Sequence, residues 1–456
     1  MPLLDGLFHS PPVEPFFSDA ACVQAILDFE AALARAESKA SLIPPTASVA
    51  IAANCRAELI DLSSLASAAP QSASLAIPLV KQLTALVAKQ DAEAARFIHW
   101  GATSQDAIDT GLILQIRNAL TPILIDLDSL CDTLAELADT HRSTPIPART
   151  LLQQAIPTSF GFIVAGWLDA LLRHRTRILA LKNNSLVLQF GGAVGTLAAL
   201  GANGPIVAKL LAEGLSLPLP AAPWHSHRDR IAEIATTFGL LSGSLAKIAH
   251  DLSLHMQTEI AELSEPAAPG RGSSSTMPHK QNPVACAAIL AATTRVPGLV
   301  STILSAMPQD YQRGLGNWHA EAQTITEILR FSAGALHHLA TLTPNLQINT
   351  VRMRANLDLS HGLIYAEAIS IALAEKLGRA VAHEKIESAC AATARSGRHL
   401  REVLSSQFDP STLLPTADLD RLFDPLNYLG SSSAFIDAIL AANNTRKNLQ
   451  EAISKG

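Results

Sequence analysis

The sequence predicts an all-α protein built around a central bundle of long helices. Almost half of its residues are hydrophobic (48%) but only 4% are aromatic, so the apolar mass is mostly Ala, Leu, Ile and Val. Ala and Leu are strong helix formers. The charged fraction is only 16%, which favours helices that are buried on more than one face. No stretch alternates apolar and polar residues regularly enough to predict a sheet.

Apolar residues spaced by three and four predict the individual helices. A first amphipathic helix is expected over 23–42, before Pro44. The longer periodic segments that follow cover residues 106–120, 123–142, 158–183, 231–264, 284–304 and 321–342. A helix of about 30 residues is roughly 45 Å long, which is long for a compact monomer. Helices of this length and composition usually pack against copies of themselves, so we expect a homo-oligomer.

These segments divide the chain into three predicted parts. Residues 1–105 are expected to form an N-terminal helical domain. Residues 106–352 hold the long helices and are predicted to form the central bundle and oligomer core. Residues 353–456, where the periodic segments shorten again, are predicted to form a C-terminal helical domain.

Charge, hydropathy and cysteine usage exclude several classes of function. The net charge of −6 and the lack of a Lys/Arg run argue against a nucleic-acid partner. No uninterrupted apolar run reaches the roughly 18 to 20 residues of a membrane span, and the N-terminus does not resemble a signal peptide. The five scattered cysteines favour free thiols in a reducing cytosol. We therefore expect a cytoplasmic protein with no membrane partner, no metal and no cofactor.

The segment most informative about function is an irregular loop over residues 272–283, between two predicted long helices. It combines small residues and hydroxyls with Lys280 and Asn282. Prolines and glycines in and around the loop break helices and demand turns. Irregular loops of about 20 residues are usually functional or disordered. The lysine and the amide predict an anion-binding loop, and a mobile linker is the alternative.

A second cluster lies at residues 99–110. Thr103 or Ser104 could simply cap the following helix, with Asp106 in its first turn. As a functional site, the free N–H groups and the hydroxyls would form a cradle for a carboxylate. His99 could add a proton or a positive charge to that cradle.

Two further clusters, at residues 149–157 and 223–230, say less when taken alone. Polar residues such as Thr150 and Gln153 are common before a helix. His225 alternates with another histidine, but nearby Cys or Glu partners for a standard zinc site are lacking. The cluster at residues 223–230 is therefore either a surface loop or a basic loop that binds an anion.

Taken together and in this order, the clusters resemble the fumarase/aspartase superfamily. Its signature loop, Gly-Ser-Ser-x-Met-Pro-x-Lys-x-Asn-Pro, is matched by residues 273–283, with Ser273 in place of the leading glycine. The resemblance implies a three-domain all-α fold whose long helices assemble into a twenty-helix core. It also implies a homotetramer in which each active site draws on three subunits.

Within the superfamily, the sequence is similar to the bacterial 3-carboxy-cis,cis-muconate cycloisomerases. The matching stretches are residues 99–106, 188–193, 224–225, 228–230 and 317–321. The lyases of the superfamily pair a histidine at the position of Leu151 with a glutamate at the position of Ala287, and this chain lacks both. Cycloisomerases usually carry tryptophan at the first position, so Leu151 departs from them too. The second acid/base group is therefore open between His99, His225 and neither.

The resemblance implies a cofactor-independent enzyme that converts 3-carboxy-cis,cis-muconate to 4-carboxymuconolactone through an enediolate. This reaction belongs to protocatechuate degradation in the β-ketoadipate pathway. Ser274 matches the catalytic serine of the family. The residues expected to bind the anionic polycarboxylate substrate are His99, Thr103, Ser104, Thr150, Gln153, His225, Arg228, Lys280, Asn282 and Arg313.

Three alternatives remain at this stage. A lyase acting on adenylosuccinate or argininosuccinate is disfavoured by Leu151 and Ala287. A cycloisomerase for a modified muconate remains open, because one pocket side chain can change specificity. A non-catalytic structural relative is disfavoured by the intact Ser274, Lys280 and Asn282.

Overall fold

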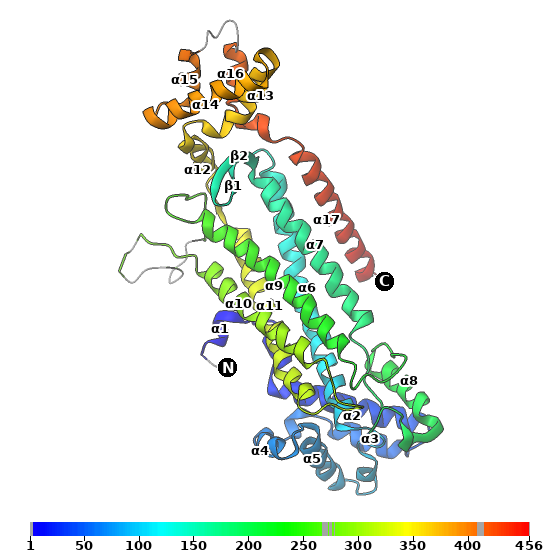
Figure 1. Cartoon of the computed structure of the whole chain (residues 1–456). Coiled ribbons are helices and arrows are strands. Elements are labelled where there is room, and N and C mark those ends of the chain that lie inside the picture. Colours follow the sequence, from blue (N-terminus) through cyan, green and yellow to red (C-terminus); the bar gives the residue numbers. More distant parts are fainter. Residues whose placement is uncertain (1–2, 267–271, 273–275, 278, 408–414, 456) are drawn as a thin grey trace. The chain divides into compact units, whose positions relative to one another are not determined.

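The computed structural model of the chain describes residues 3–266, 272, 276–277, 279–407 and 415–455. It confirms the prediction of an all-α fold with a bundle of long helices (Figure 1). The long helices are α6 (Ser104–Thr140), α7 (Phe160–Asn184), α9 (Asp229–His255), α10 (Val284–Ala306) and α11 (Asn317–Leu342).

The chain divides into two compact units, and each gathers segments that are distant in the sequence. Unit 1 comprises Met1–Leu127, Arg173–Lys247 and Ala287–Leu339. Unit 2 comprises Asp128–Leu172, Ile248–Cys286 and Ala340–Gly456. The three-domain division stays a prediction.

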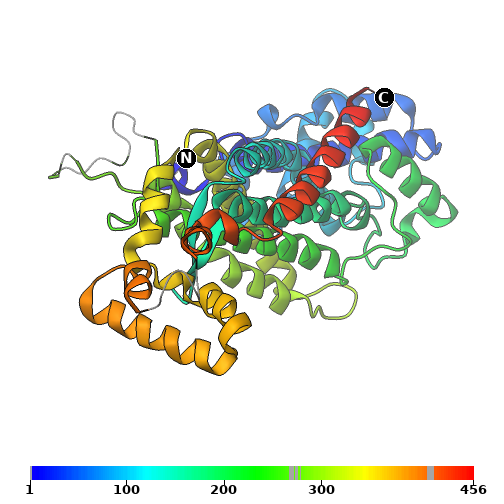
Figure 2. The ribbon, with the colours of Figure 1, turned by 90° about the horizontal axis from the view of Figure 1, so that it is seen from above.

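Unit 1 contains the N-terminal helices and one end of each long helix. Its shorter elements are α1 (Asp5–Phe8), η1 (Glu14–Phe17), α2 (Asp19–Lys39), α3 (Pro45–Asn54), η2 (Ala57–Leu59), α4 (Leu62–Ser72), α5 (Ala76–Ala88), η3 (Ala94–Phe97), η4 (Ala198–Asn203) and α8 (Gly204–Leu215). Helix α2 begins at an N-cap, where the Ser18 hydroxyl accepts a hydrogen bond from the Ala21 N–H. It is buried on several faces, and α8 lies beside it (Figures 1 and 2).

Unit 2 contains the strands and the C-terminal helices. Its shorter elements are β1 (Pro145–Thr150), β2 (Gln153–Ser159), β3 (Leu263–Ser264), η5 (Thr343–Asn345), β4 (Gln347–Ile348), α12 (Thr350–Asn356), η6 (Leu357–Ser360), η7 (Leu363–Tyr365), α13 (Ala366–Leu377), α14 (Arg379–Ser396), α15 (Leu400–Gln407), α16 (Thr416–Leu422), η8 (Pro425–Tyr428) and α17 (Ser432–Lys455). Helices α13 to α16 share a core of their own, with Ile369, Leu373 and Leu404 fully buried in it.

Two helix boundaries differ from the predictions. The helix expected over 231–264 ends at His255, whose carbonyl accepts a hydrogen bond from the Glu262 N–H. Ala261 has a φ of +51°, which a helix cannot contain. The helices expected over 106–120 and 123–142 are the single helix α6, which continues through Pro122. The neighbours Leu120 and Ile123 are fully buried, so packing outweighs the cost of the proline there.

The expectation that the chain has no sheet was wrong for two short antiparallel strand pairs, of which only β1–β2 is a hairpin. Strand β1 pairs antiparallel with β2, and β3 pairs with β4. The β1–β2 pair contains Pro145, Pro147 and Pro157, which the sequence presents as strand breakers. A two-stranded pair has only edge strands, and edge strands tolerate proline.

Two described helices, α9 and α10, are long and apolar enough to cross a membrane by length and composition alone. They lack an uninterrupted apolar run, which is why the sequence did not predict them. In each helix an 18-residue stretch meets this criterion. Within the chain, 56% of that stretch is buried in α9, but only 33% in α10. Helix α10 therefore presents apolar surface that the single chain leaves uncovered.

His174 makes the stability of unit 1 depend on pH. It lies on α7, is almost fully buried, and its Nε2 atom lies 2.8 Å from the Ser244 hydroxyl on α9. Burial, with help from Arg177 and Arg173, lowers the pKa of His174 from 6.5 to about 4. Protonation therefore favours the unfolded chain, and we predict that stability falls as the pH drops from 6.5 towards 4. In His174→Gln, urea unfolding should show a smaller loss over this window, and an unchanged pH dependence would contradict the assignment.

Candidate functional site

Thr103, Ser104 and Arg313 meet at the N-terminus of α6. The Arg313 guanidinium donates from Nη1 to the Thr103 hydroxyl at 2.6 Å and from Nη2 to the Ser104 hydroxyl at 3.2 Å. The loop before α11 that carries Arg313 is closed by its own hydrogen bonds, since Asn317 donates from Nδ2 to the Pro308 carbonyl. All three predicted ligands are half-buried. The structure therefore brings together two hydroxyls, a cation and a helix N-terminus, which suit an anion.

Directly beneath them lies the buried carboxylate of Asp106. Its Oδ2 atom accepts a hydrogen bond from the Thr103 N–H at 3.0 Å, as in a capping box. Its Oδ1 atom lies 2.7 Å from Nε2 of His225. The backbone N–H groups of Gly191 and Gly192 also donate to the carboxylate, to Oδ1 at 3.0 Å and to Oδ2 at 2.9 Å. The capping interpretation and the functional interpretation of this cluster are thus both compatible with the geometry.

Glycine is required where the 188–193 stretch approaches Asp106. A Cβ atom on Gly191 would lie 2.9 Å from the imidazole of His225. Gly192 has a φ of +67°, and a Cβ there would lie 2.8 Å from the Gly101 carbonyl oxygen. Larger residues would push the backbone donors away from the carboxylate, so this stretch of sequence is explained by close packing.

Arg228 is completely buried between two carboxylates. Its guanidinium donates to Asp109 at 2.8 and 3.0 Å and to Glu321 at 2.5 and 3.0 Å. Burial would lower the pKa of Arg228, but Asp109 and Glu321 raise it. Trp318 donates from Nε1 to Asp109 at 3.0 Å, which ties the start of α11 to α6. The predicted substrate contacts of Arg228 and of buried His225 stay predictions, and their geometry favours a structural role.

His99 is held in an unusual conformation by Glu30, a residue that the sequence did not single out. His99 has a φ of +59°, and its Nδ1 atom lies 2.6 Å from Oε1 of Glu30 on α2. Burial would lower the pKa of His99, but Glu30 and, more weakly, Asp106 raise it above its ordinary value. His99 therefore favours its cationic form. It lies shortly before Thr103 in the sequence. The sequence offered one signal that could have identified Glu30. It is a charged residue that lies between Ile26 and Leu33, two apolar residues of the core.

In unit 2, Thr150 and Gln153 flank the tip of the β1–β2 hairpin. Both are exposed, and they pair across a two-residue turn made by Leu151 and Leu152. These leucines have φ values of +51° and +65°, a conformation that hairpin turns usually assign to Asn-Gly. Their exposed fractions are 98% and 75%. The tip therefore combines a strained backbone with exposed apolar side chains, and the substrate contacts predicted for Thr150 and Gln153 stay predictions.

The hairpin is anchored through Arg149 to a second buried carboxylate, Glu262. Arg149 donates to both Glu262 oxygens, at 3.0 and 2.8 Å. Nδ1 of His255 lies 2.6 Å from Oε2, and Asn356 donates to Oε1 at 2.8 Å. Burial would raise the pKa of Glu262, but His255, Arg149 and Asn356 lower it. This network fixes the base of the hairpin, and sequence reasoning missed it because its members come from four separate segments.

The signature loop is described only in part, and the predicted catalytic Ser274 lies outside the described residues. Lys280 is exposed, and Asn282 is half-buried. The backbone N–H of Asn282 donates to the Gly272 carbonyl at 2.9 Å, which closes the loop. Glu265, which no sequence motif marks, accepts hydrogen bonds from the Ala285 and Cys286 N–H groups and caps α10.

Residues 9–298 match the protein family described as lyase, and residues 362–439 match the adenylosuccinate lyase C-terminus family. The chain belongs to this lyase family. The resemblance to the fumarase/aspartase superfamily is thereby confirmed.

Individual relatives of the lyase family extend this result. The chain is 50% identical to the 3-carboxy-cis,cis-muconate cycloisomerase of Pseudomonas aeruginosa, over 97% of this chain and 96% of that protein. It is 39% identical to the nitrosuccinate lyase of Streptomyces davaonensis, over 95% and 93% of the two chains. The crystal structure of the 3-carboxy-cis,cis-muconate lactonizing enzyme from Pseudomonas putida superposes with a TM-score of 0.94, at 48% identity, and covers 97% of this chain and 99% of the other.

Asp106 provides a direct test of this arrangement. In Asp106→Asn the Thr103, Gly191 and Gly192 N–H groups would lose a charged acceptor, and the donors to one of its two oxygens would face an N–H group. We predict a destabilisation of about 3 to 5 kcal/mol, measured as a lower urea midpoint at fixed protein concentration. Glu58→Gln, in an exposed ion pair with Arg56, is the control and should change stability by less than about 0.5 kcal/mol. Equal effects in the two variants would show that Asp106 does not organise the site.

Proposed function

We propose that this member of the lyase family is a 3-carboxy-cis,cis-muconate cycloisomerase, which forms 4-carboxymuconolactone without a cofactor. The near full-length likeness to the Pseudomonas aeruginosa enzyme carries the proposal. The site in unit 1 supports it, because hydroxyls, a guanidinium and a helix N-terminus suit a polycarboxylate substrate.

The chemistry sets the demands on the site. In lactonisation, one substrate carboxylate adds across a conjugated double bond, and the carbon beside another carboxylate takes up a proton. The reverse reaction removes that proton and expels the ring carboxylate. In both directions a doubly charged enediolate forms, so preorganised positive charge and hydrogen-bond donors lower the barrier.

The Thr103 and Ser104 hydroxyls are arranged to donate. Each accepts a hydrogen bond from Arg313, so its own O–H proton is free to point towards a bound carboxylate. The guanidinium charge strengthens both donors. We infer that Thr103, Ser104 and Arg313 bind one substrate carboxylate, with His99 adding positive charge nearby.

The remaining roles rest on the family match. Ser274 would transfer the proton to and from carbon. Lys280 and Asn282 would bind the carboxylate on which the enediolate forms, and Thr150 and Gln153 would contact the substrate from the hairpin tip. We assign His225 and Arg228 to positioning, because each is buried against carboxylates of the protein.

Leu151 and Ala287 favour a cycloisomerase over a lyase that expels an amine or hydroxide. Such leaving groups need an acid, and the paired His and Glu of those lyases are absent here. A carboxylate leaves without protonation, so lactone chemistry tolerates the loss. A lyase acting on adenylosuccinate or argininosuccinate remains the alternative to be tested, together with a cycloisomerase for a modified muconate.

We further propose a cytoplasmic homotetramer whose active sites combine residues of three subunits. Members of the superfamily act on polycarboxylates and are typically oligomeric. Helix α10 supports the proposal, since only 33% of its apolar 18-residue stretch is buried within one chain. Packing against α10 of other subunits would cover this surface.

The activity is tested by adding 3-carboxy-cis,cis-muconate to the purified full chain, without metal, and following the loss of diene absorbance. We predict rapid loss, and at least a ~1,000-fold lower kcat in Ser274→Ala, because the proton-transfer group is removed. Ser63→Ala, at an exposed position on α4, should keep full activity. If wild-type protein is inactive here but cleaves adenylosuccinate or argininosuccinate, the cycloisomerase proposal is wrong.

Glu30 links the activity to pH through His99. Replacing Glu30 by Gln removes the carboxylate that raises the pKa of His99, so the cation is lost at lower pH. We predict that the alkaline decline of kcat/KM shifts to lower pH in Glu30→Gln. Glu58→Gln, which removes an exposed carboxylate, is the control and should leave the pH profile unchanged. Identical pH profiles for wild type and Glu30→Gln would rule out this role for His99.

A further inference from the structure

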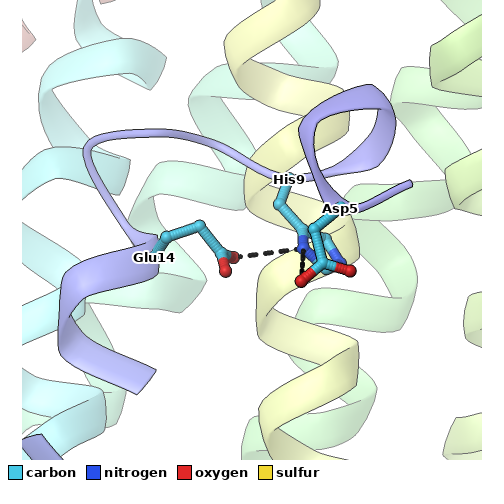
Figure 3. A group of neighbouring side chains, drawn as sticks. All are labelled: Asp5, His9 and Glu14. Atoms are coloured by element: carbon cyan, nitrogen blue, oxygen red, sulfur yellow. Dashed lines mark ion pairs between the residues drawn. The ribbon is translucent and has the colours of Figure 1, made fainter. Parts of the chain in front are cut away.

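Asp5, His9 and Glu14 converge at the N-terminus of unit 1, away in sequence from every cluster discussed above (Figure 3). Asp5 begins the short helix α1, His9 follows it, and Glu14 begins η1. Their ligand atoms all lie within 4.8 Å of one another. The sequence predicted no metal, because the spacing of these three residues matches no familiar motif.

His9 points into this cluster with a nitrogen that lacks a hydrogen bond. Only 7% of the residue is exposed, and its Nδ1 atom is buried without a hydrogen-bond partner. The nearest carboxylate oxygens are Oε1 of Glu14 at 3.3 Å and Oδ2 of Asp5 at 3.9 Å. Figure 3 shows the ring nitrogen directed towards both carboxylates. A buried polar nitrogen of this kind is costly unless a further group satisfies it.

Both carboxylates also pair with one guanidinium, that of Arg330 on α11. Arg330 contacts the same two carboxylate oxygens that lie nearest to Nδ1 of His9. It donates from Nε to Oε1 of Glu14 at 2.9 Å and from Nη2 to Asp5 at 3.2 Å. Carboxylates that bind metals are commonly held by hydrogen bonds of this kind, which fix their orientation. Each oxygen has more than one lone pair, so acceptance from Arg330 leaves capacity for a cation.

We propose that Asp5, His9 and Glu14 form a structural site for a divalent transition-metal cation such as Zn²⁺. One imidazole nitrogen and two carboxylate oxygens are donors that Zn²⁺ prefers, at about 2.0 to 2.2 Å, with water completing the shell. The three ligands need to contract only slightly around the ion. A bound ion would fasten the N-terminal segment to α11 through Arg330.

The test is Zn²⁺ binding to the full chain by competition with a chromophoric chelator, together with thermal unfolding. We predict one strong site per chain and a rise in Tm with Zn²⁺. His9→Ala and Glu14→Gln should each weaken that site about tenfold or more and remove the rise in Tm. Mg²⁺, which prefers oxygen ligands, should not substitute for Zn²⁺.

The matched control is His383→Ala, which removes an exposed histidine on α14 and should leave the site unchanged. Equal Zn²⁺ affinity in wild type and in both ligand variants would overturn the proposal, because the binding would then lie elsewhere. No strong binding to wild type would overturn it as well. Melting of each variant without Zn²⁺ separates loss of the site from loss of the fold.

Discussion

The candidate site of unit 1 depends on one buried charge, the carboxylate of Asp106. A carboxylate without water requires donors on all sides, and here they come from Thr103, the 189–192 stretch and His225. Satisfying that requirement brings the start of α6, a glycine-rich turn and the loop before α9 to one place. The Thr103 and Ser104 hydroxyls are then held where Arg313 reaches them. The groups that we propose to bind substrate are thus positioned by a residue that need not touch substrate.

Unit 2 is also organised by a buried carboxylate, that of Glu262. Glu262 gathers Arg149, His255 and Asn356, and so fixes the base of the hairpin whose tip carries Thr150 and Gln153. The rigid base permits a strained tip, since Leu151 and Leu152 hold positive φ angles without glycine. In each unit, a buried and hydrogen-bonded acid thus fixes the geometry of a polar cluster, half-buried in unit 1 and exposed in unit 2. In both cases the acid is more than a local cap.

The sequence predicted the fold class and most long helices because these depend on local apolar periodicity. It misplaced the end of α9, because His255, Ala261 and Glu262 stop the helix through contacts with distant segments. The sequence predicted two helices, one on each side of Pro122, where the structure has the single helix α6. Helix propensity contains no information on the burial of Leu120 and Ile123, which stabilises the continuous helix.

The candidate site was predictable where a contiguous motif carried it, as with Thr103, Ser104 and the signature loop. Its supporting acids were not, because Glu30 and Glu262 meet their partners across 69 and 113 residues of sequence. The convergence of Asp5, His9 and Glu14 was likewise invisible without the fold. The motif predicts which side chains contact the substrate, and the tertiary structure supplies the charges that orient them.

We propose that Thr103, Ser104 and Arg313 bind a substrate carboxylate in an assembled tetramer. A crystal structure of Ser274→Ala with 3-carboxy-cis,cis-muconate bound would test it most directly. We expect one carboxylate within about 3 Å of both hydroxyls and of Arg313, with Lys280 and Asn282 of neighbouring subunits on the same ligand. A substrate bound elsewhere, with Thr103 and Ser104 still paired only to Arg313, would contradict the account.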